Sequence, residues 1–202
     1  MKKLIVSILM LTFFFTSSNA QFDIDKLFGG ANLAYAKPVG EFSDYAKGGF
    51  SYNVLAGYQL TEKIGVGLEY GNAVTAALDT TLQSGLLGIN LYGLQSFLAK
   101  GWYRFTTGTV RPYVGLGIGG AQISEPDFTF TDAATNEEVT VEGASRVGLG
   151  ANIELGINIK GFNLSYSYNI SGKGPKEPVF NENIKDLNLN YHRFAAGYIY
   201  NF

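Results

Sequence analysis

The sequence predicts an all-β fold: an eight-stranded antiparallel up-and-down transmembrane β-barrel that follows a signal peptide. Three observations lead to this prediction. Apolar residues alternate with small or polar residues along several segments, which is the period-2 pattern of a strand with one apolar face. Long and short connections alternate between those segments. Charged residues make up only 16% of the chain, against about 25% in soluble domains.

The first residues have the three parts of a secretory signal peptide. Lys2 and Lys3 give a positive start, residues 4–15 are nearly all apolar, and Ser18 and Ala20 are the small residues of a cleavage site. The apolar run is shorter than the roughly 20 residues with which a helix spans a bilayer. We therefore expect residues 1–20 to be a cleaved signal peptide and residues 21–202 to form one barrel domain. The chain has no cysteine, so we expect no disulfide.

Eight strands are expected in order along the exported domain. The alternation is clearest where Phe50, Tyr52 and Val54 are separated mainly by small or polar residues. We place the strands at residues 30–36, 50–60, 64–71, 91–105, 114–119, 147–159, 162–170 and 187–202. The large apolar side chains would face lipid, and the small or polar ones would fill the interior. Ten strands remain an alternative, because residues 73–90 contain further leucines and an isoleucine.

The connections differ in length in a regular order. Long ones fall near residues 37–48, 73–90, 123–142 and 171–186, and short ones at 61–63, 106–109 and 160–161. Outer-membrane barrels have short periplasmic turns and longer extracellular loops. We therefore expect both termini in the periplasm and the long loops outside the cell. Lys160 and Gly161 fit a two-residue hairpin turn.

Strand parity predicts which charged side chains point into the barrel, because residues paired across a hairpin face the same side. The expected ion network of the lumen comprises Glu69, Lys100, Arg104, Arg111, Glu154 and Arg193. Glu69, Lys100 and Glu154 lie equally far from a short turn, so we expect Lys100 to pair with at least one carboxylate. Arg104 and Arg111 would lie opposite one another. An eight-stranded barrel has room only for its own side chains, so a filled lumen is expected and a small gated ion channel is the alternative.

The last strand carries a family resemblance. Its alternating residues end on an aromatic side chain: Phe194, Ala196, Tyr198, Tyr200 and Phe202. This end resembles the assembly signal of outer-membrane barrels, and the chain resembles the small OmpA-like and OmpX-like barrel family. The resemblance implies a location in the outer membrane, periplasmic termini and insertion by the barrel-assembly machinery. We expect a monomer in contact with outer-membrane lipid and lipopolysaccharide. No cofactor is expected.

The outward positions of this strand are even-numbered, so strict alternation would turn the apolar residues at 187, 189 and 191 toward the interior. Leu187, Leu189 and Tyr191 are also expected to face outward, which would require a bulge near Tyr191 to Arg193 or an upper strand that has left the lipid.

The third long connection is expected to form a hairpin beyond the membrane. Its apolar residues Phe128, Phe130, Val139 and Val141 alternate with threonines, and its acids include Glu125. A protruding hairpin has exposed edges to which a surface protein could add a strand. Residues 123–142 are thus a candidate interaction site.

Other functional classes find less support. The chain has a single histidine, His192, with no adjacent serine, so we expect no enzyme and keep a lipid A-modifying enzyme as the alternative. A soluble ligand-binding barrel would need its apolar face inside, which the alternating loop lengths disfavour. The net charge of −2 and the lack of a basic run argue against nucleic-acid binding.

Overall fold

The computed structural model describes residues 23–77, 91–125, 128–131, 138–174 and 185–201. The predicted signal peptide, the terminal Phe202 and much of the second and fourth long connections lie outside the described residues. The described residues form two short 3-10 helices and ten strands: η1 (Ile24–Lys26), β1 (Leu27–Pro38), η2 (Gly40–Asp44), β2 (Ala46–Gln59), β3 (Ile64–Ala77), β4 (Leu91–Arg104), β5 (Val110–Ser124), β6 (Phe128–Thr131), β7 (Glu138–Val141), β8 (Ser145–Ile159), β9 (Phe162–Ile170) and β10 (Tyr191–Asn201). None of the helices in these described ranges is long and apolar enough to cross a membrane.

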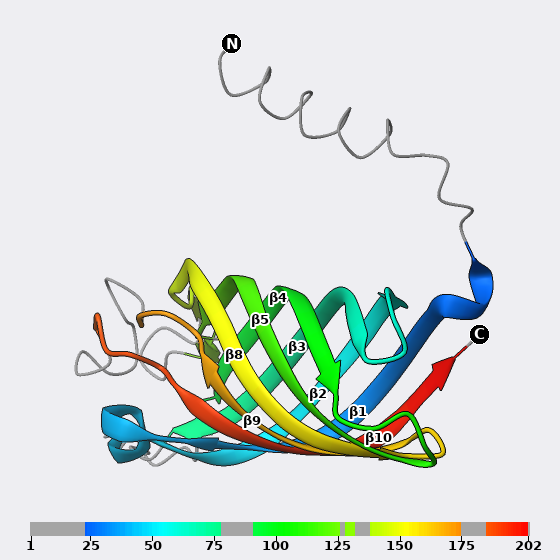
Figure 1. Cartoon of the computed structure of the whole chain (residues 1–202). Helices are drawn as coiled ribbons and strands as arrows, with labels where there is room; N and C mark the ends of the chain where they lie inside the picture. Colours follow the sequence, from blue (N-terminus) through cyan, green and yellow to red (C-terminus); the bar gives the residue numbers. More distant parts are fainter. Residues whose placement is uncertain (1–22, 78–90, 126–127, 132–137, 175–184, 202) are drawn as a thin grey trace, which may run out of the picture.

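Eight of the strands close into one antiparallel barrel (Figure 1), which confirms the predicted fold. The order around the barrel is β1-β10-β9-β8-β5-β4-β3-β2, and β1 pairs with both β2 and β10. The strands β6 and β7 pair only with each other and form a separate two-stranded sheet. The alternative of a ten-stranded barrel is therefore wrong.

The two ends of the barrel differ in their connections. At one end, which we call the short-turn end, β1 begins, β10 ends, and short turns join β2 to β3, β4 to β5 and β8 to β9 (Figure 1). The other end is called the long-loop end. Lys160 and Gly161 have φ angles of 51° and 93°, as the predicted two-residue hairpin turn requires. Most strands extend further than predicted; β1 reaches Pro38 and β3 reaches Ala77, so the first two long connections are shorter than expected. The fourth is longer, because β10 begins only at Tyr191.

The predicted facing of the side chains is confirmed along the barrel. Large apolar residues such as Phe50, Phe97 and Leu155 are more than half exposed on the outer surface, whereas their neighbours point inward. Some inward positions must be glycine because the strands approach closely: a Cβ atom at Gly119 would lie only 2.1 Å from the carbonyl oxygen of Phe97 on β4.

The apolar residues around the start of the last strand do not face outward, contrary to what we expected from the sequence. Leu189 and Tyr191 are fully buried inside the barrel, and Leu187 packs against the same cluster. Pairing of β10 with β1 and β9 runs without a register shift from Tyr191 onward, so no bulge is needed. These residues face inward because this part of the interior is apolar rather than polar.

Candidate functional site

The centre of the lumen holds a cluster of four buried charges. Lys100 on β4 lies between two carboxylates: its Nζ atom is 2.6 Å from Oε2 of Glu69 on β3, and it also donates to Oε2 of Glu154 on β8. Arg193 on β10 donates to Oε1 of Glu69 at 2.8 Å. All four side chains are almost completely buried, and their formal charges sum to zero. The pairing offsets the desolvation of each charge.

Neutral polar side chains complete the contacts of the two carboxylates. Asn53 donates to Glu69 at 3.2 Å, and the Tyr113 hydroxyl lies 3.2 Å from Glu154 and 2.9 Å from the amide oxygen of Asn163. The predicted site did not include these residues. Their inward parity is readable from the sequence, but a neutral side chain gives no sign that it touches a charge.

Arg104 and Arg111 do not join the cluster, which corrects their predicted place in the network. They lie at the short-turn end and line one hollow there. The Arg104 guanidinium lies 5.6 Å from the centre of the Phe28 ring, and Nε of Arg111 donates to the carbonyl oxygen of Gly108 at 2.8 Å. Both arginines are too close to the turns to reach the carboxylates in the middle of the barrel.

An apolar cap fills the lumen on the other side of the charges. Phe42 of η2 folds inward and is fully buried, with its ring centre 5.9 Å from that of Tyr92. The remaining members of the cap are Ala36, Ala46, Ala73, Leu94, Ile123, Leu189 and Tyr191. Side chains from two connections, η2 and the one before β10, therefore close the long-loop end. In the described part of the chain, packed apolar side chains thus lie above the paired charge cluster.

The third long connection forms the expected hairpin in its described part. In the pairing of β6 with β7, Phe128 is opposite Val141 and Phe130 is opposite Val139. The barrel pairing of β5 with β8 ends at Ser124 and Ser145, before this ribbon begins.

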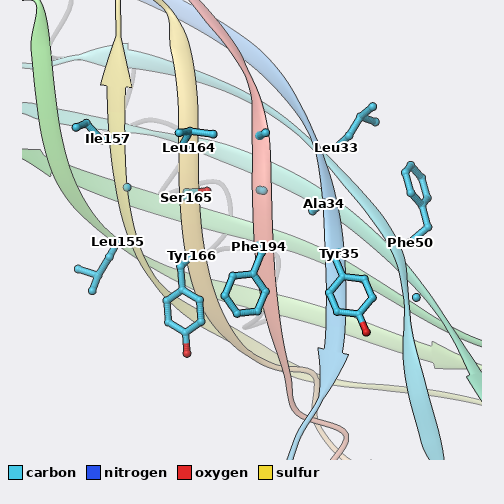
Figure 2. A pocket seen from close by; sticks show the side chains of 14 residues that line it. Leu33, Ala34, Tyr35, Phe50, Leu155, Ile157, Leu164, Ser165, Tyr166 and Phe194 are labelled. Carbon is cyan, nitrogen blue, oxygen red and sulfur yellow. The ribbon is translucent and has the colours of Figure 1, made fainter.

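The outer wall of the barrel carries a shallow apolar groove (Figure 2). It has a volume of about 930 Å³ and crosses β8, β9, β10, β1 and β2. Figure 2 shows Leu164 and Leu33 on either side of β10, with Phe194 between Tyr166 and Tyr35 one row further along. Ala196 lies opposite Leu164 on one strand and Leu33 on the other, so its short side chain leaves the groove open.

His192 lies on the same outer wall at the long-loop end of β10. Its Nδ1 atom is 2.6 Å from the Tyr166 hydroxyl, and its ring lies between those of Tyr166 and Tyr168, with centres 5.3 and 5.4 Å away. Within the described ranges, no serine and no carboxylate forms a hydrogen bond with it.

Three further outward residues belong to the expected assembly signal. Phe194, Tyr198 and Tyr200 are each about half exposed on the outer wall. This position suits aromatic side chains at a membrane interface as well as a terminal signal.

Comparisons with known proteins agree with this architecture. The family model of the outer membrane protein beta-barrel domain matches residues 6–202. The fold is similar to that of neisserial surface protein A (NspA), with a TM-score of 0.58 and 18% identity over 88% of this chain and 97% of NspA. It is also similar to Ail, the attachment invasion locus protein of Yersinia pestis, with a TM-score of 0.51 and 16% identity over 87% of this chain and 99% of Ail. No curated protein matches the chain by sequence.

Proposed function

Because the chain belongs to the outer membrane protein beta-barrel domain family, and so resides in the cell outer membrane, we propose that it is a non-conducting barrel that presents a binding hairpin outside the cell. The observation that carries the proposal is the filled lumen. A neutral cluster around Lys100 occupies its centre, and the cap around Phe42 closes its long-loop end. A barrel of this size has little interior space beyond its own side chains.

Conductance in planar bilayers tests the closed lumen. We expect the current to stay at background for the intact protein and for Lys100→Ala. The alternative is a gate in which Lys100 leaves one carboxylate and ions enter. Discrete openings that become more frequent in Lys100→Ala would support that gate and contradict our proposal.

The proposed orientation places the short-turn end in the periplasm. Because the chain has no cysteine, single cysteines can report the side of the membrane without background. A cysteine at the exposed position 43 of η2 (Ser43→Cys) should react with a membrane-impermeant maleimide on intact cells. Thr107→Cys in a short turn should react only after the outer membrane is opened. The reverse result would invert the orientation.

The hairpin of β6 and β7 is the proposed binding surface. Its two strands pair with each other and not with the barrel, so its edges can receive a strand from a partner. Ail has been crystallised with the heparin analogue sucrose octasulfate, a polyanion. Residues 123–142 of this chain carry six acids and no base, so we expect a protein partner rather than a polyanion here.

Capture of surface proteins tests this role. The intact protein is compared with a variant in which residues 126–142 are replaced by a short Gly-Ser linker. A matched control replaces the outward Val147 on β8 by alanine and keeps the hairpin. A partner retained by the control and lost by the linker variant supports the proposal, and equal retention by all three contradicts it.

We also propose that the chain is not an enzyme. His192 has two tyrosines as neighbours rather than a nucleophile and an orienting acid. Mass analysis of lipid A from cells with and without the protein should show the same acyl chains. A change that disappears in His192→Ala would overturn this part of the proposal.

Insertion by the barrel-assembly machinery is proposed from the alternating aromatic row of Phe194, Tyr198, Tyr200 and Phe202. Deletion of Phe202 should leave less folded barrel in the outer membrane, whereas Asn201→Ser, a change of the preceding polar residue, should not. Equal amounts of folded barrel would contradict an assembly role for the terminal aromatic residue.

A further inference from the structure

The outer wall at β9, β10 and β1 combines an apolar groove with a cationic rim. We propose that this wall binds one anionic, phosphate-bearing membrane lipid, with an acyl chain in the groove at Ala196 and the phosphate at Lys37 and His192. The inference rests on the proposed membrane orientation, since it places the lipid headgroup at the long-loop end.

The strand register arranges the wall in three rows. In the first row, Leu164, Ala196 and Leu33 are paired neighbours. In the second, Tyr166, Phe194 and Tyr35 are paired neighbours, and in the third, Tyr168, His192 and Lys37 are. The wall thus changes from apolar, to aromatic, to polar and cationic toward the long-loop end. A lipid has the same sequence of properties from its acyl chain to its headgroup.

The first row provides the space for an acyl chain. Leu33 and Leu164 are each more than half exposed, and they are the cross-strand neighbours of Ala196 on either side. Between these two leucines Ala196 carries only a methyl group, and this leaves the groove whose lining Figure 2 shows. The Phe194 ring lies further along the groove, toward the rim. A long apolar chain in this groove would contact side chains along its length, and each buried methylene would add about 0.8 kcal/mol.

The third row provides the donors for a phosphate. Lys37 and His192 are direct cross-strand neighbours at the ends of β1 and β10. The Tyr166 hydroxyl lies 2.6 Å from Nδ1 of His192. In the tautomer in which that hydroxyl donates to Nδ1, the ring proton is on Nε2 and can be donated to a phosphate oxygen. Among the described residues Lys37 forms no ion pair, so its ammonium group can bind the same phosphate.

Charge complementarity favours an anionic lipid over a neutral one. None of the outward residues of β9, β10 and β1 is acidic. In a lipid with no net charge, the lipid's own ammonium group balances the phosphate. The contact with Lys37 would therefore add less binding free energy for such a lipid than for one with net negative charge. The occupant is therefore an anionic lipid of the leaflet at the long-loop end.

Native mass spectrometry of the full chain in detergent tests the site. The probes are phosphatidylglycerol and phosphatidylcholine with identical acyl chains, and lipid A as the phosphate-bearing lipid of the outer leaflet. We expect one tightly retained phosphatidylglycerol or lipid A and about tenfold weaker retention of phosphatidylcholine. Lys37→Gln and His192→Gln should each weaken phosphatidylglycerol binding about tenfold, because each removes one hydrogen bond to a charged group.

Matched variants separate the groove and the rim from general effects. Ala196→Leu should fill the groove and abolish tight binding, whereas Ala99→Leu, also outward but on β4, should not. Lys63→Gln removes an exposed lysine at the short-turn end and should leave binding unchanged. Equal retention of both phospholipids by the intact protein, or unchanged binding in Lys37→Gln and Ala196→Leu, would overturn the lipid site. Either result would leave the conductance and labelling tests of the proposed function unaffected.

Discussion

Replacement of Lys100 by methionine should destabilise the barrel by about 3–5 kcal/mol, because it removes one partner from a buried ion network. The two carboxylates are not left with the same number of hydrogen-bond and ion-pair partners after this substitution. Glu69 keeps Arg193 at 2.8 Å, Asn53 at 3.2 Å and Asn152 at 3.4 Å. Among the described residues, Glu154 keeps only the Tyr113 hydroxyl, at 3.2 Å. The uncompensated charge therefore falls on Glu154.

This asymmetry predicts which second substitution restores stability. Glu154→Gln added to Lys100→Met leaves Glu69 paired with Arg193 and should recover at least half of the loss. Glu69→Gln added to Lys100→Met should not, since it removes the partner of Arg193 and leaves Glu154 charged. Lys63→Met, at an exposed position, should change the free energy of unfolding by no more than about 0.5 kcal/mol.

Urea unfolding in lipid vesicles measures these differences. Trp102 is the single tryptophan and lies inside the barrel, so its fluorescence reports unfolding. The reasoning is refuted if Lys100→Met costs less than about 1 kcal/mol, or if Glu69→Gln rescues it as well as Glu154→Gln does.

Three further predictions test the packing of the barrel and its long-loop end. Gly119→Ala should cost about 1–3 kcal/mol by urea unfolding, because its Cβ would press on a carbonyl oxygen of β4, while Gly120→Ala has free space and should cost little; equal effects would contradict this packing. Phe42→Ala should cost about 3–5 kcal/mol by the same measurement, whereas a loss below about 1 kcal/mol would show that the cap contributes little. A hydrogen bond from Arg146 holds the pKa of Asp186 below its ordinary value, so this ion pair is complete above the ordinary pKa of an aspartate and is lost as the pH falls through the lowered one. Arg146→Gln should raise the Asp186 pKa in an NMR titration, and an unchanged value would refute the assignment.

Most of the barrel could be predicted from the sequence because its pattern is local. An apolar residue at every second position fixes which side of each strand meets lipid, as for Phe50, Phe97 and Leu155. Short turns such as Lys160–Gly161 then fix which residues of adjacent strands are opposite. Parity alone was therefore sufficient to place Lys100, Glu69 and Glu154 inside the barrel.

The extent of the polar interior could not be read in the same way. Alternation separates the two faces of a strand, but where the interior is also apolar it does not by itself show which face meets lipid. Leu189 and Tyr191 alternate with asparagines, and they point inward because the cap around Phe42 gives them apolar neighbours inside the lumen. Inward parity likewise did not show that Arg104 and Arg111 lie at the short-turn end, away from the carboxylates.

By itself, the sequence determined the closed antiparallel barrel, the lipid-facing residues and the set of inward charges, because each follows from spacing along one strand or across one turn. Only the tertiary structure decided the full set of contacts among these charges. The distance from a short turn predicted that Lys100 meets a carboxylate, but not that it meets both Glu69 and Glu154. It also did not predict that Arg193 reaches Glu69, although 124 positions separate them. These contacts depend on how strand tilt and closure of the barrel position each side chain, which spacing along one strand does not record.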